Sequence, residues 1–267
     1  MILSDCHMHT MFSTDSKAEP EEMVKGAIEK GLTAICFTDH HDKDYPVEGA
    51  FMFDTDEYFR RLTSLKEKYK DRIDIRIGVE IGLQTHLGEY YRNYVNRYPF
   101  DFVIGSLHVI DHMDPYEPEY FSDKTDEEGY IHAFEEMVDD IKAVQDFDVL
   151  GHIDYIVRYG REKAAHYSYE KFAPYIDAIL KEVIARGKGI ELNTSGYKYG
   201  LGFCHPNPDI IKRYKELGGE IITVGADGHR PDHIAYDFGK AAEVLKACGF
   251  KYYTEFQARN PIFKQVP

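Results

Sequence analysis

The stretch DCHMHT occupies residues 5–10 and follows the apolar residues 1–3 and Ser4 at the start of the 267-residue chain. An apolar run that leads into polar residues predicts a first β-strand that ends in a loop. Residues two apart in a strand point to the same side, so His7 and His9 can face one point. Two imidazoles that converge at a strand end are a half-site for a divalent metal. Because a His-x-His pair is short and degenerate, two exposed histidines are an equal alternative when the pair is considered alone.

Apolar runs and amphipathic stretches alternate along the rest of the chain. The apolar runs predict seven strands, at Ile2–His7, Ala34–Asp39, Arg76–Gly82, Phe102–His108, Val149–Ile153, Gly189–Asn193 and Ile221–Ala226. The stretches between them predict helices at Pro20–Lys30, Asp56–Lys70, Gly88–Arg97, Gly129–Gln145, Tyr169–Arg186, Pro208–Leu217 and His233–Cys248. Strands that alternate with helices imply an α/β fold whose parallel sheet has right-handed crossovers. Closed on itself, this series predicts a TIM-like barrel with one unit missing, as a single domain over residues 1–267; an open doubly wound sheet is the alternative.

The composition limits the classes of partner. The net charge is −15 at pH 7, whereas nucleic-acid binding usually requires a basic face, so we expect no nucleic-acid partner. The charge does not exclude a small phosphorylated substrate, which needs only a few local cations. No apolar run reaches eighteen residues and no signal-peptide pattern is present, so we expect no membrane association. The four cysteines are scattered without a regular spacing, which favours reduced thiols in the cytoplasm. The sequence leaves the oligomeric state open.

Polar residues, most of them of metal-binding type, end all seven predicted strands. In chain order these ends carry His7 and His9, TDHHD at 38–42, Glu80, His108, GHID at 151–154, ELNTS at 191–195 and GADGHR at 225–230. Because the C-terminal ends of barrel strands build one face, this distribution favours the barrel over the open sheet. Charged groups crowded on one face are costly unless cations neutralise them. Mixed imidazole and carboxylate ligands suit Zn, Fe or Mn better than Ca.

Six of these segments resemble, in order, the motifs of the PHP (polymerase and histidinol phosphatase) family. They are DCHMHT at 5–10, TDHH at 38–41, GVE at 78–80, SLH at 106–108, GHID at 151–154 and GADGH at 225–229. The resemblance spans nearly the whole chain and implies a distorted (β/α)7 barrel with a trinuclear metal site at the C-terminal ends of the strands. The size of the chain and its lack of extra domains resemble those members that hydrolyse L-histidinol phosphate in histidine biosynthesis.

The resemblance also implies which residues hold the three divalent ions. One ion would be bound by His7, His9, Glu80 and Asp227, a second by Glu80, His108 and His152, and the third by Asp15, His40 and His229. A carboxylate that bridges two cations holds them about 3.5–4 Å apart, as in two-metal hydrolases. An activated hydroxide between them can attack phosphorus in line, while the third ion helps to bind the phosphate and the leaving oxygen.

Cationic side chains beside these motifs are candidates for phosphate binding, because phosphoryl transfer requires the equatorial oxygens to be neutralised. Arginine matches phosphate oxygens bidentately, and Arg158 and Arg230 lie close in sequence to implied ligands. Ser195 is a neutral donor for the same group. We expect Arg161 and Lys198 to be ordinary surface residues.

Other features leave alternatives open. Asp154 either orients a ligand histidine or donates a proton to the leaving alkoxide, and His41 is either a proton shuttle or a solvent-facing neighbour of His40. The segment Ile110–Gly129, rich in acids and aromatic residues, is either a lid that binds a cationic amine and an imidazole or a solvated loop. Histidines in helix or loop patterns, such as His205, are not predicted to be ligands.

Three other functions compete with phosphatase action on histidinol phosphate. A PHP phosphoesterase for nucleotides or short oligonucleotides would favour a basic track with stacking aromatics, which the net charge of −15 opposes. A scaffold that has lost catalysis would not need metal-binding residue types at its strand ends. An amidohydrolase-like barrel typically couples His-x-His to a lysine on a middle strand, and no lysine lies at these strand ends.

Overall fold

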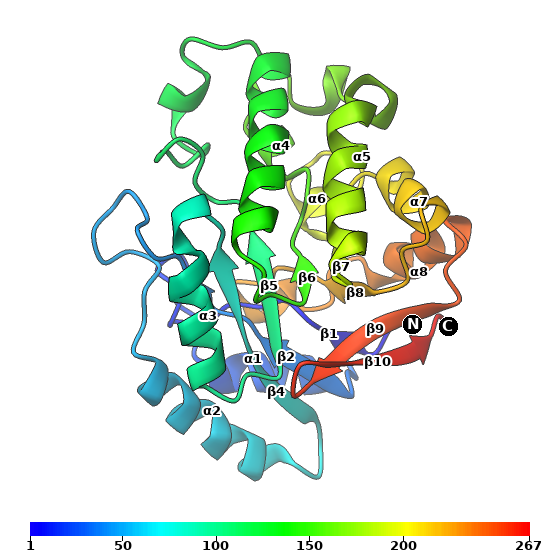
Figure 1. Cartoon of the computed structure of the whole chain (residues 1–267). Helices are drawn as coiled ribbons and strands as arrows, with labels where there is room; N and C mark the ends of the chain where they lie inside the picture. Colours follow the sequence, from blue (N-terminus) through cyan, green and yellow to red (C-terminus); the bar gives the residue numbers. More distant parts are fainter.

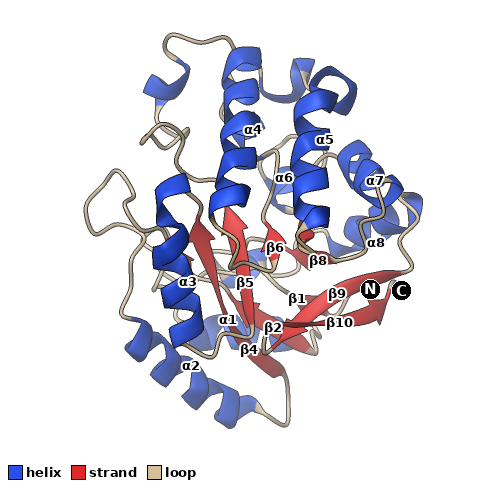
Figure 2. Ribbon diagram, viewed as in Figure 1, coloured by secondary structure: helices blue, strands red, loops and turns tan.

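All 267 residues are described by the computed structural model, whose centre is a parallel β-sheet rolled into a barrel (Figures 1 and 2). The main strands pair in the order β1-β2-β4-β5-β6-β7-β8, and each of these pairs is parallel. They span Ser4–Asp5 (β1), Ala34–Phe37 (β2), Asp74–Gly82 (β4), Phe102–Ser106 (β5), Val149–Leu150 (β6), Gly189–Asn193 (β7) and Ile222–Gly225 (β8). The short strand β3 (His40–His41) pairs farther along β4.

The two edges of this sheet meet. Just after β1, the backbone N–H of Cys6 donates to Val224 O of β8 at 3.0 Å, and Asp227 N donates to His7 O at 2.9 Å. A parallel bridge at Met8 extends the join. The sheet is therefore a nearly closed α/β barrel, which confirms the barrel prediction over the open sheet.

Helices cover the outside of the barrel, and all of them except the unpredicted four-residue α6 lie close to the positions predicted from the sequence pattern (Figure 2). They span Pro20–Glu29 (α1), Thr55–Tyr69 (α2), Gly88–Arg97 (α3), Asp126–Ala143 (α4), Tyr169–Ala185 (α5), Ser195–Lys198 (α6), Pro208–Glu216 (α7) and Phe238–Ala247 (α8). Local signals set their starts. Pro20 opens α1 beside a capping box of Glu19 and Glu22, and Thr125 and Glu128 form a second box at α4. None of the helices combines the length and the apolarity needed to cross a membrane.

Two parts of the structure differ from the prediction. The helix expected from His233 begins only at Phe238, because Pro231–His233 forms a separate 3₁₀ turn and Asp237 adopts a left-handed conformation with φ of 53°. The chain then ends in an antiparallel hairpin of β9 (Tyr252–Gln257) and β10 (Asn260–Gln265). A series of β-α units does not predict this hairpin.

The hairpin closes the end of the barrel at which the strands begin. A large cluster of 63 buried residues forms the main core. A separate small cluster is made of Cys6, Cys36, Phe102, Ile104, Val149 and, from β9, Phe256. Phe256 stacks on Phe102 with ring centroids 5.0 Å apart, and Arg76 of β4 forms a buried ion pair with Glu255 at 2.8 Å. The opposite end, where the strands finish, stays available for a functional site.

Candidate metal centre and its cavity

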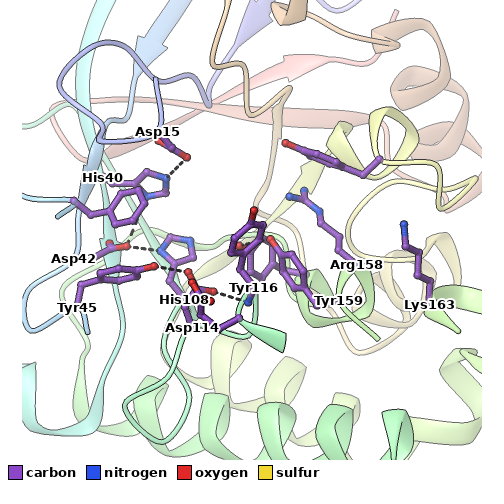
Figure 3. Close-up of a pocket in the computed structure, with 14 residues that line it drawn as sticks. Asp15, His40, Asp42, Tyr45, His108, Asp114, Tyr116, Arg158, Tyr159 and Lys163 are labelled. Carbon is purple, nitrogen blue, oxygen red and sulfur yellow. Dashed lines mark hydrogen bonds and ion pairs between the residues drawn. The ribbon is translucent and has the colours of Figure 1, made fainter. Parts of the chain in front are cut away.

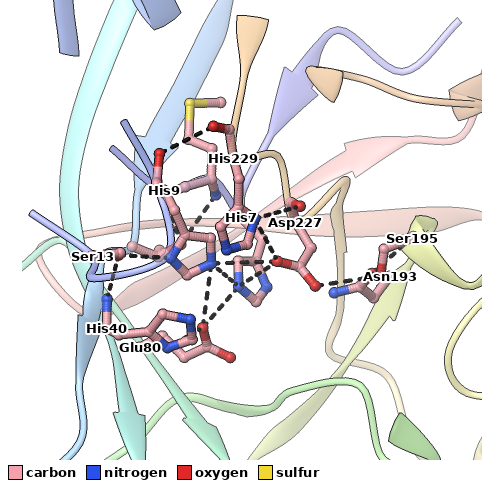
Figure 4. Close-up of polar contacts among 12 residues, drawn as sticks. His7, His9, Ser13, His40, Glu80, Asn193, Ser195, Asp227 and His229 are labelled. Atoms are coloured by element: carbon pink, nitrogen blue, oxygen red, sulfur yellow. Dashed lines mark hydrogen bonds and ion pairs between the residues drawn. The ribbon is translucent and has the colours of Figure 1, made fainter. Parts of the chain in front are cut away.

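Near the C-terminal end of β4 lies Glu80, a fully buried carboxylate on which histidines from several strands converge (Figure 4). Its Oε2 lies 3.0 Å from His7 Nε2, 3.4 Å from His9 Nε2 and 3.2 Å from His40 Nδ1. His7 and His9 follow β1, and His40 belongs to β3. The structure thus brings the His-x-His pair to one carboxylate.

The other oxygen of Glu80 faces a second group. Its Oε1 lies 2.9 Å from His152 Nε2 and 3.3 Å from His108 Nε2, and Ser106 Oγ donates to it at 2.6 Å. His108 follows β5 and His152 follows β6. A carboxylate with different histidines on each oxygen has the arrangement of a ligand that bridges two cations.

A third group lies beside His9. Asp227 Oδ1 lies 3.4 Å from His9 Nε2 and 3.6 Å from His229 Nδ1. Asp15 Oδ2 lies 2.9 Å from His229 Nε2 and 3.9 Å from His40 Nε2. All the ligands implied by the sequence resemblance therefore gather at one face of the barrel, although His40 contacts the Glu80 group as well as the Asp15 group.

Hydrogen bonds on the far ring nitrogens orient two of these histidines. His7 Nδ1 donates to Glu191 Oε1 at 2.6 Å, and His108 Nδ1 donates to Asp42 Oδ2 at 2.8 Å. Metal-bound histidines usually make such a second bond to a carboxylate. Sequence reasoning noted Glu191 at a strand end but gave it no role. The signal that could have found it is an acid near the C-terminal end of β7, which pairs with β8, the strand that leads into Asp227.

His9 is oriented in the same way through a hydroxyl group. Its Nδ1 lies 3.0 Å from Ser13 Oγ, and the Ser13 hydroxyl donates to Asp39 Oδ1 at 2.9 Å. Since the Ser13 proton is committed to Asp39, Ser13 accepts from His9, and the His9 proton sits on Nδ1. The Nε2 atoms of His7, His9 and His108 are therefore lone-pair nitrogens when these rings are neutral.

These lone pairs face one another, which is unfavourable unless a cation lies between them. The Nε2 atoms of His7 and His9 are 3.0 Å apart, with Glu80 Oε2 close to both. His40 Nδ1 and His229 Nε2 are buried without a hydrogen-bond partner, although a carboxylate oxygen lies near each. Burial lowers the pKa of His9 and of His40 to about 4, whereas at His7 burial is outweighed by the carboxylates of Glu191 and Glu80, which raise the pKa. The position between these rings therefore takes a positive charge, either a proton on His7 or a metal cation. Divalent cations fit this donor set.

A cavity of about 660 Å³ opens directly beside the cluster (Figure 3). Asp15, His40, Asp42 and His108 lie on one side of it, and Arg158 points into the open space from the other side. The remaining lining residues are aromatic or charged: Tyr45, Phe51, Asp114, Tyr116, Glu117, Tyr155, Tyr159, Lys163 and Tyr199. The cavity therefore joins the metal-binding residue types to a cation, to acids and to aromatic rings.

Arg158 is held firmly at the cavity wall. Its side chain is 8% exposed, and its Nη2 donates to Ser195 Oγ and lies 3.6 Å from Asp227 Oδ2. The guanidinium carbon lies 4.9 Å from the centre of the Tyr155 ring and 4.3 Å from that of Tyr199. Arginine in this setting suits a phosphate oxygen next to the metal-binding residues.

The other candidate cations lie elsewhere. Arg230 is 63% exposed and does not line the cavity, because it pairs with Asp232 at 3.1 Å. Lys198 is half-buried rather than a surface residue, and its Nζ donates to the backbone carbonyl of Asp227 at 3.0 Å. Arg161 is exposed, as expected, and donates to backbone carbonyls of the loop before α4.

His41 points away from the cluster that contains its neighbour His40. Its Nε2 lies 2.9 Å from the Tyr90 hydroxyl, and its ring stacks on Tyr94 with centroids 3.8 Å apart. Burial lowers the pKa of His41 to about 3. The ring is thus a neutral member of an aromatic stack, 3% exposed and not facing solvent.

Asp154 is fully buried, and its carboxylate is occupied by other donors. Oδ1 accepts from His205 Nδ1 at 2.5 Å, and Oδ2 accepts from Asn207 N at 2.8 Å and from the Tyr167 hydroxyl at 3.1 Å. Asp154 does not line the cavity, and the histidine that it orients is not one of the implied ligands. His205 lies 51 positions further along the chain, so no sequence spacing connects the two.

The segment between β5 and α4 overhangs the cavity. Asp114, Tyr116 and Glu117 belong to its wall. Asp114 is fixed in place, since its Oδ2 accepts from the Tyr45 hydroxyl at 2.5 Å and its Oδ1 accepts from Tyr116 N at 2.7 Å. Of the two alternatives for this segment, the contacts favour a binding loop over a purely solvated one.

Similarity to known proteins extends over almost the whole chain. A model of the PHP domain matches residues 5–195. A probable histidinol-phosphatase of Clostridium acetobutylicum is 36% identical over 250 residues, which cover 94% of this chain and 95% of that protein. The histidinol-phosphatase of Lactococcus lactis is 31% identical over 258 residues, with coverage of 94% and 93%. The crystal structure of a Lactococcus lactis histidinol phosphate phosphatase complexed with zinc, L-histidinol and phosphate matches with a TM-score of 0.89 at 30% identity, covering 97% of this chain and 98% of that one.

Proposed function

Because this chain belongs to the PHP family, we propose that it is a metal-dependent phosphomonoesterase that hydrolyses L-histidinol phosphate to L-histidinol and phosphate in histidine biosynthesis. Relatives that match over nearly their full length are named for this activity, and a structure with L-histidinol and phosphate shares the fold. One observation carries the proposal. A single cavity joins the Glu80 cluster to a buried arginine and to acidic and aromatic side chains.

We propose that three divalent ions, of Zn, Fe or Mn, bind among the converging ligands. The three sets are His7, His9, Asp227 and Glu80 Oε2; His108, His152 and Glu80 Oε1; and Asp15, His40 and His229. The facing lone pairs and the division of histidines between the two oxygens of Glu80 support this assignment. When bound, such ions neutralise phosphate oxygens and supply an activated nucleophile.

Arg158 completes the phosphate subsite in this proposal. Ser195, predicted as a donor to the phosphate, is fully buried and does not line the cavity, so it acts by holding Arg158 in place. The guanidinium reaches the cavity next to Asp227, so a phosphoryl group bound at the metal centre lies within its range. Its planar donors match the equatorial oxygens, whose charge must be neutralised in the transition state. Ser195 accepts from Arg158 and donates to Asn193, which fixes the arginine. We give Arg230, His41 and Asp154 no direct part in the reaction, because none of them lines the cavity.

The loop between β5 and α4 binds the organic half of the substrate in this proposal. L-Histidinol phosphate carries an ammonium group and a flat imidazole. Asp114 and Glu117 supply negative charge for the ammonium group, and the rings of Tyr116 and Tyr159 supply faces for the imidazole. These two rings meet edge-on, with centroids 6.0 Å apart, and both line the cavity.

The fold and the composition also support proposals for the domain organisation, the location and the partner of the protein. We propose that residues 1–267 form one PHP-type domain, because one sheet contains all the main strands and the terminal hairpin packs against it. The four free, buried cysteines support the cytoplasmic location expected from the sequence. We propose a small phosphorylated substrate as the partner of this site, with no nucleic acid and no membrane surface.

Phosphate release from L-histidinol phosphate tests the proposal. The protein is assayed at measured metal content, beside a nucleoside monophosphate and a short oligonucleotide. We expect fast release from L-histidinol phosphate alone, abolished by a chelator and restored by divalent metal. Faster turnover of the nucleotide would assign the site to nucleotide hydrolysis instead. A metal-replete protein that is inactive on all three would support a scaffold.

A further inference from the structure

His205 contacts Arg158 on the side away from the cavity (Figure 3 shows the cavity side). Arg158 Nε donates to His205 Nε2 at 3.0 Å, and Arg158 Nη2 donates to Ser195 Oγ. Arg158 lines the cavity, and its Nη1 makes no hydrogen bond to a protein group. Nη1 is therefore free to donate to a ligand. Two neutral acceptors thus hold the guanidinium and leave one edge for an anionic ligand.

His205 accepts from Arg158 only while its Nε2 carries no proton. Its Nδ1 lies 2.5 Å from Asp154 Oδ1, so the single ring proton sits on Nδ1. Asp154 cannot turn away, because Asn207 N and the Tyr167 hydroxyl both donate to its Oδ2. His205 is fully buried, and burial lowers its pKa, which keeps the ring neutral beside the guanidinium. Asp154 therefore sets the tautomer that Arg158 requires.

The backbone holds His205 just as firmly. His205 N donates to Asn193 O at 2.7 Å, and Asn193 N donates to His205 O at 2.6 Å, which ties His205 to the end of β7. Asn193 Oδ1 also accepts from Ser195 N at 2.9 Å. The two side chains that hold Arg158 are therefore carried by one rigid unit.

We propose that His205 is a positioning residue for phosphate binding, which aims Arg158 at the cavity through the Asp154–His205–Arg158 chain of hydrogen bonds. Without His205, the Nε–H of a side chain that is 8% exposed loses its partner, and the guanidinium can turn towards Asp227. The identity of the phosphate ester rests on the proposed function, whereas the binding of inorganic phosphate does not.

The test measures binding of inorganic phosphate to the metal-loaded protein by calorimetry, together with KM and kcat for L-histidinol phosphate. We expect His205→Ala to weaken phosphate binding about tenfold and to raise KM more than it lowers kcat, at unchanged metal content. His205→Gln keeps a donor and an acceptor at the same place and should recover most of the affinity. In an Arg158→Ala background, His205→Ala should cost less than about twofold further, because its effect passes through the arginine.

Two further variants keep the test decisive. Cys204→Ala removes a buried neighbour that makes no bond to Arg158, and it should bind phosphate like the parent protein. If His205→Ala fails to fold, Asp154→Asn replaces it. The donors to Oδ2 hold the amide oxygen there, so the new NH₂ group faces His205 Nδ1 and moves the ring proton to Nε2.

The outcomes separate the inference from the proposed function. Unchanged phosphate affinity in His205→Ala, or in Asp154→Asn where alanine does not fold, overturns the inference. An equal loss with and without Arg158 also overturns it, because the role would then be structural. A protein that binds phosphate through His205 but does not hydrolyse L-histidinol phosphate overturns the proposed function alone.

Discussion

Replacing Glu191 by glutamine should weaken the metal centre without disturbing the fold. Glu191 Oε2 accepts from His152 N at 3.1 Å and from Asn193 Nδ2 at 3.0 Å, and Oε1 accepts from His7 Nδ1 at 2.6 Å. Because two donors require an acceptor at the Oε2 position, the glutamine oxygen takes that place and its NH₂ group faces His7. The proton of His7 then moves to Nε2, the atom that faces Glu80 and His9.

The size of the effect follows from the role of Glu191. Loss of a carboxylate that orients a metal-bound histidine typically costs about 10–100-fold in metal affinity. Here the change also removes a negative charge next to His7 and turns a ligand nitrogen into a donor, so we expect the upper half of that range, about 2–3 kcal/mol. The loss should fall mainly on the ion held by His7 and His9.

The assay is metal content at fixed free Zn²⁺ or Mn²⁺, set by a competing chelator, with activity measured on the same samples. Glu29→Gln is the matched control, since Glu29 is exposed on α1 and the charge change is the same. We expect Glu191→Gln to lose one ion at metal concentrations that saturate the control, with an unchanged circular dichroism spectrum. A metal affinity within about threefold of the control would refute the argument from the tautomer of His7.

Other perturbations test other parts of the site. Removing metal with a chelator should lower the free energy of unfolding by about 3 kcal/mol per ion, relative to protein with free metal a hundredfold above its Kd. Calorimetry should therefore show a lower melting temperature that recovers when metal is added back. Metal loss with an unchanged melting temperature would contradict binding among facing lone pairs. The double variant Asp114→Asn, Glu117→Gln should raise KM for L-histidinol phosphate about tenfold and leave KM for an aryl phosphate unchanged in a steady-state assay. Equal increases in KM for both substrates would argue against a binding loop. Burial raises the pKa of Asp140 from 3.8 to about 8, so its folded form holds a proton that the unfolded form releases, and stability should fall as pH rises from about 4 to 8. Asp140→Asn should therefore stabilise the protein by a few kcal/mol (about 2–4) at pH 8 and by much less at pH 5, as measured by urea unfolding; an equal gain at both pH values would contradict the assignment.

The convergence of the ligands could be predicted because it depends on topology. Parallel barrel strands deliver their C-terminal residues to one face, so Glu80, His108 and His152 had to meet once the strands were placed. That only one of the neighbours His40 and His41 faces the metal centre could be predicted as well. The two residues form a two-residue strand, in which neighbours point to opposite sides, so only one of them can face the centre.

The supporting contacts could not be predicted, because they depend on how loops return to the barrel. Asp154 and His205 meet only because a turn 51 positions away pairs with the end of β7. Arg158 and Arg230 are equivalent as sequence neighbours of ligands, yet one points into the cavity and the other into solvent. The direction of a side chain at a strand end is set by such tertiary contacts, which hydrophobic periodicity does not record.

The hairpin that plugs the barrel has a consequence for how the protein is made. β9 and β10 follow all seven barrel strands in the chain, so they leave the ribosome after those strands. Until they dock, Phe102 lacks the stacking partner that Phe256 provides, and the thiols of Cys6 and Cys36 lie next to an unsealed opening. Docking of the hairpin therefore completes the packing of Phe102 and shields the two thiols, at the end of the barrel opposite the metal-binding residues.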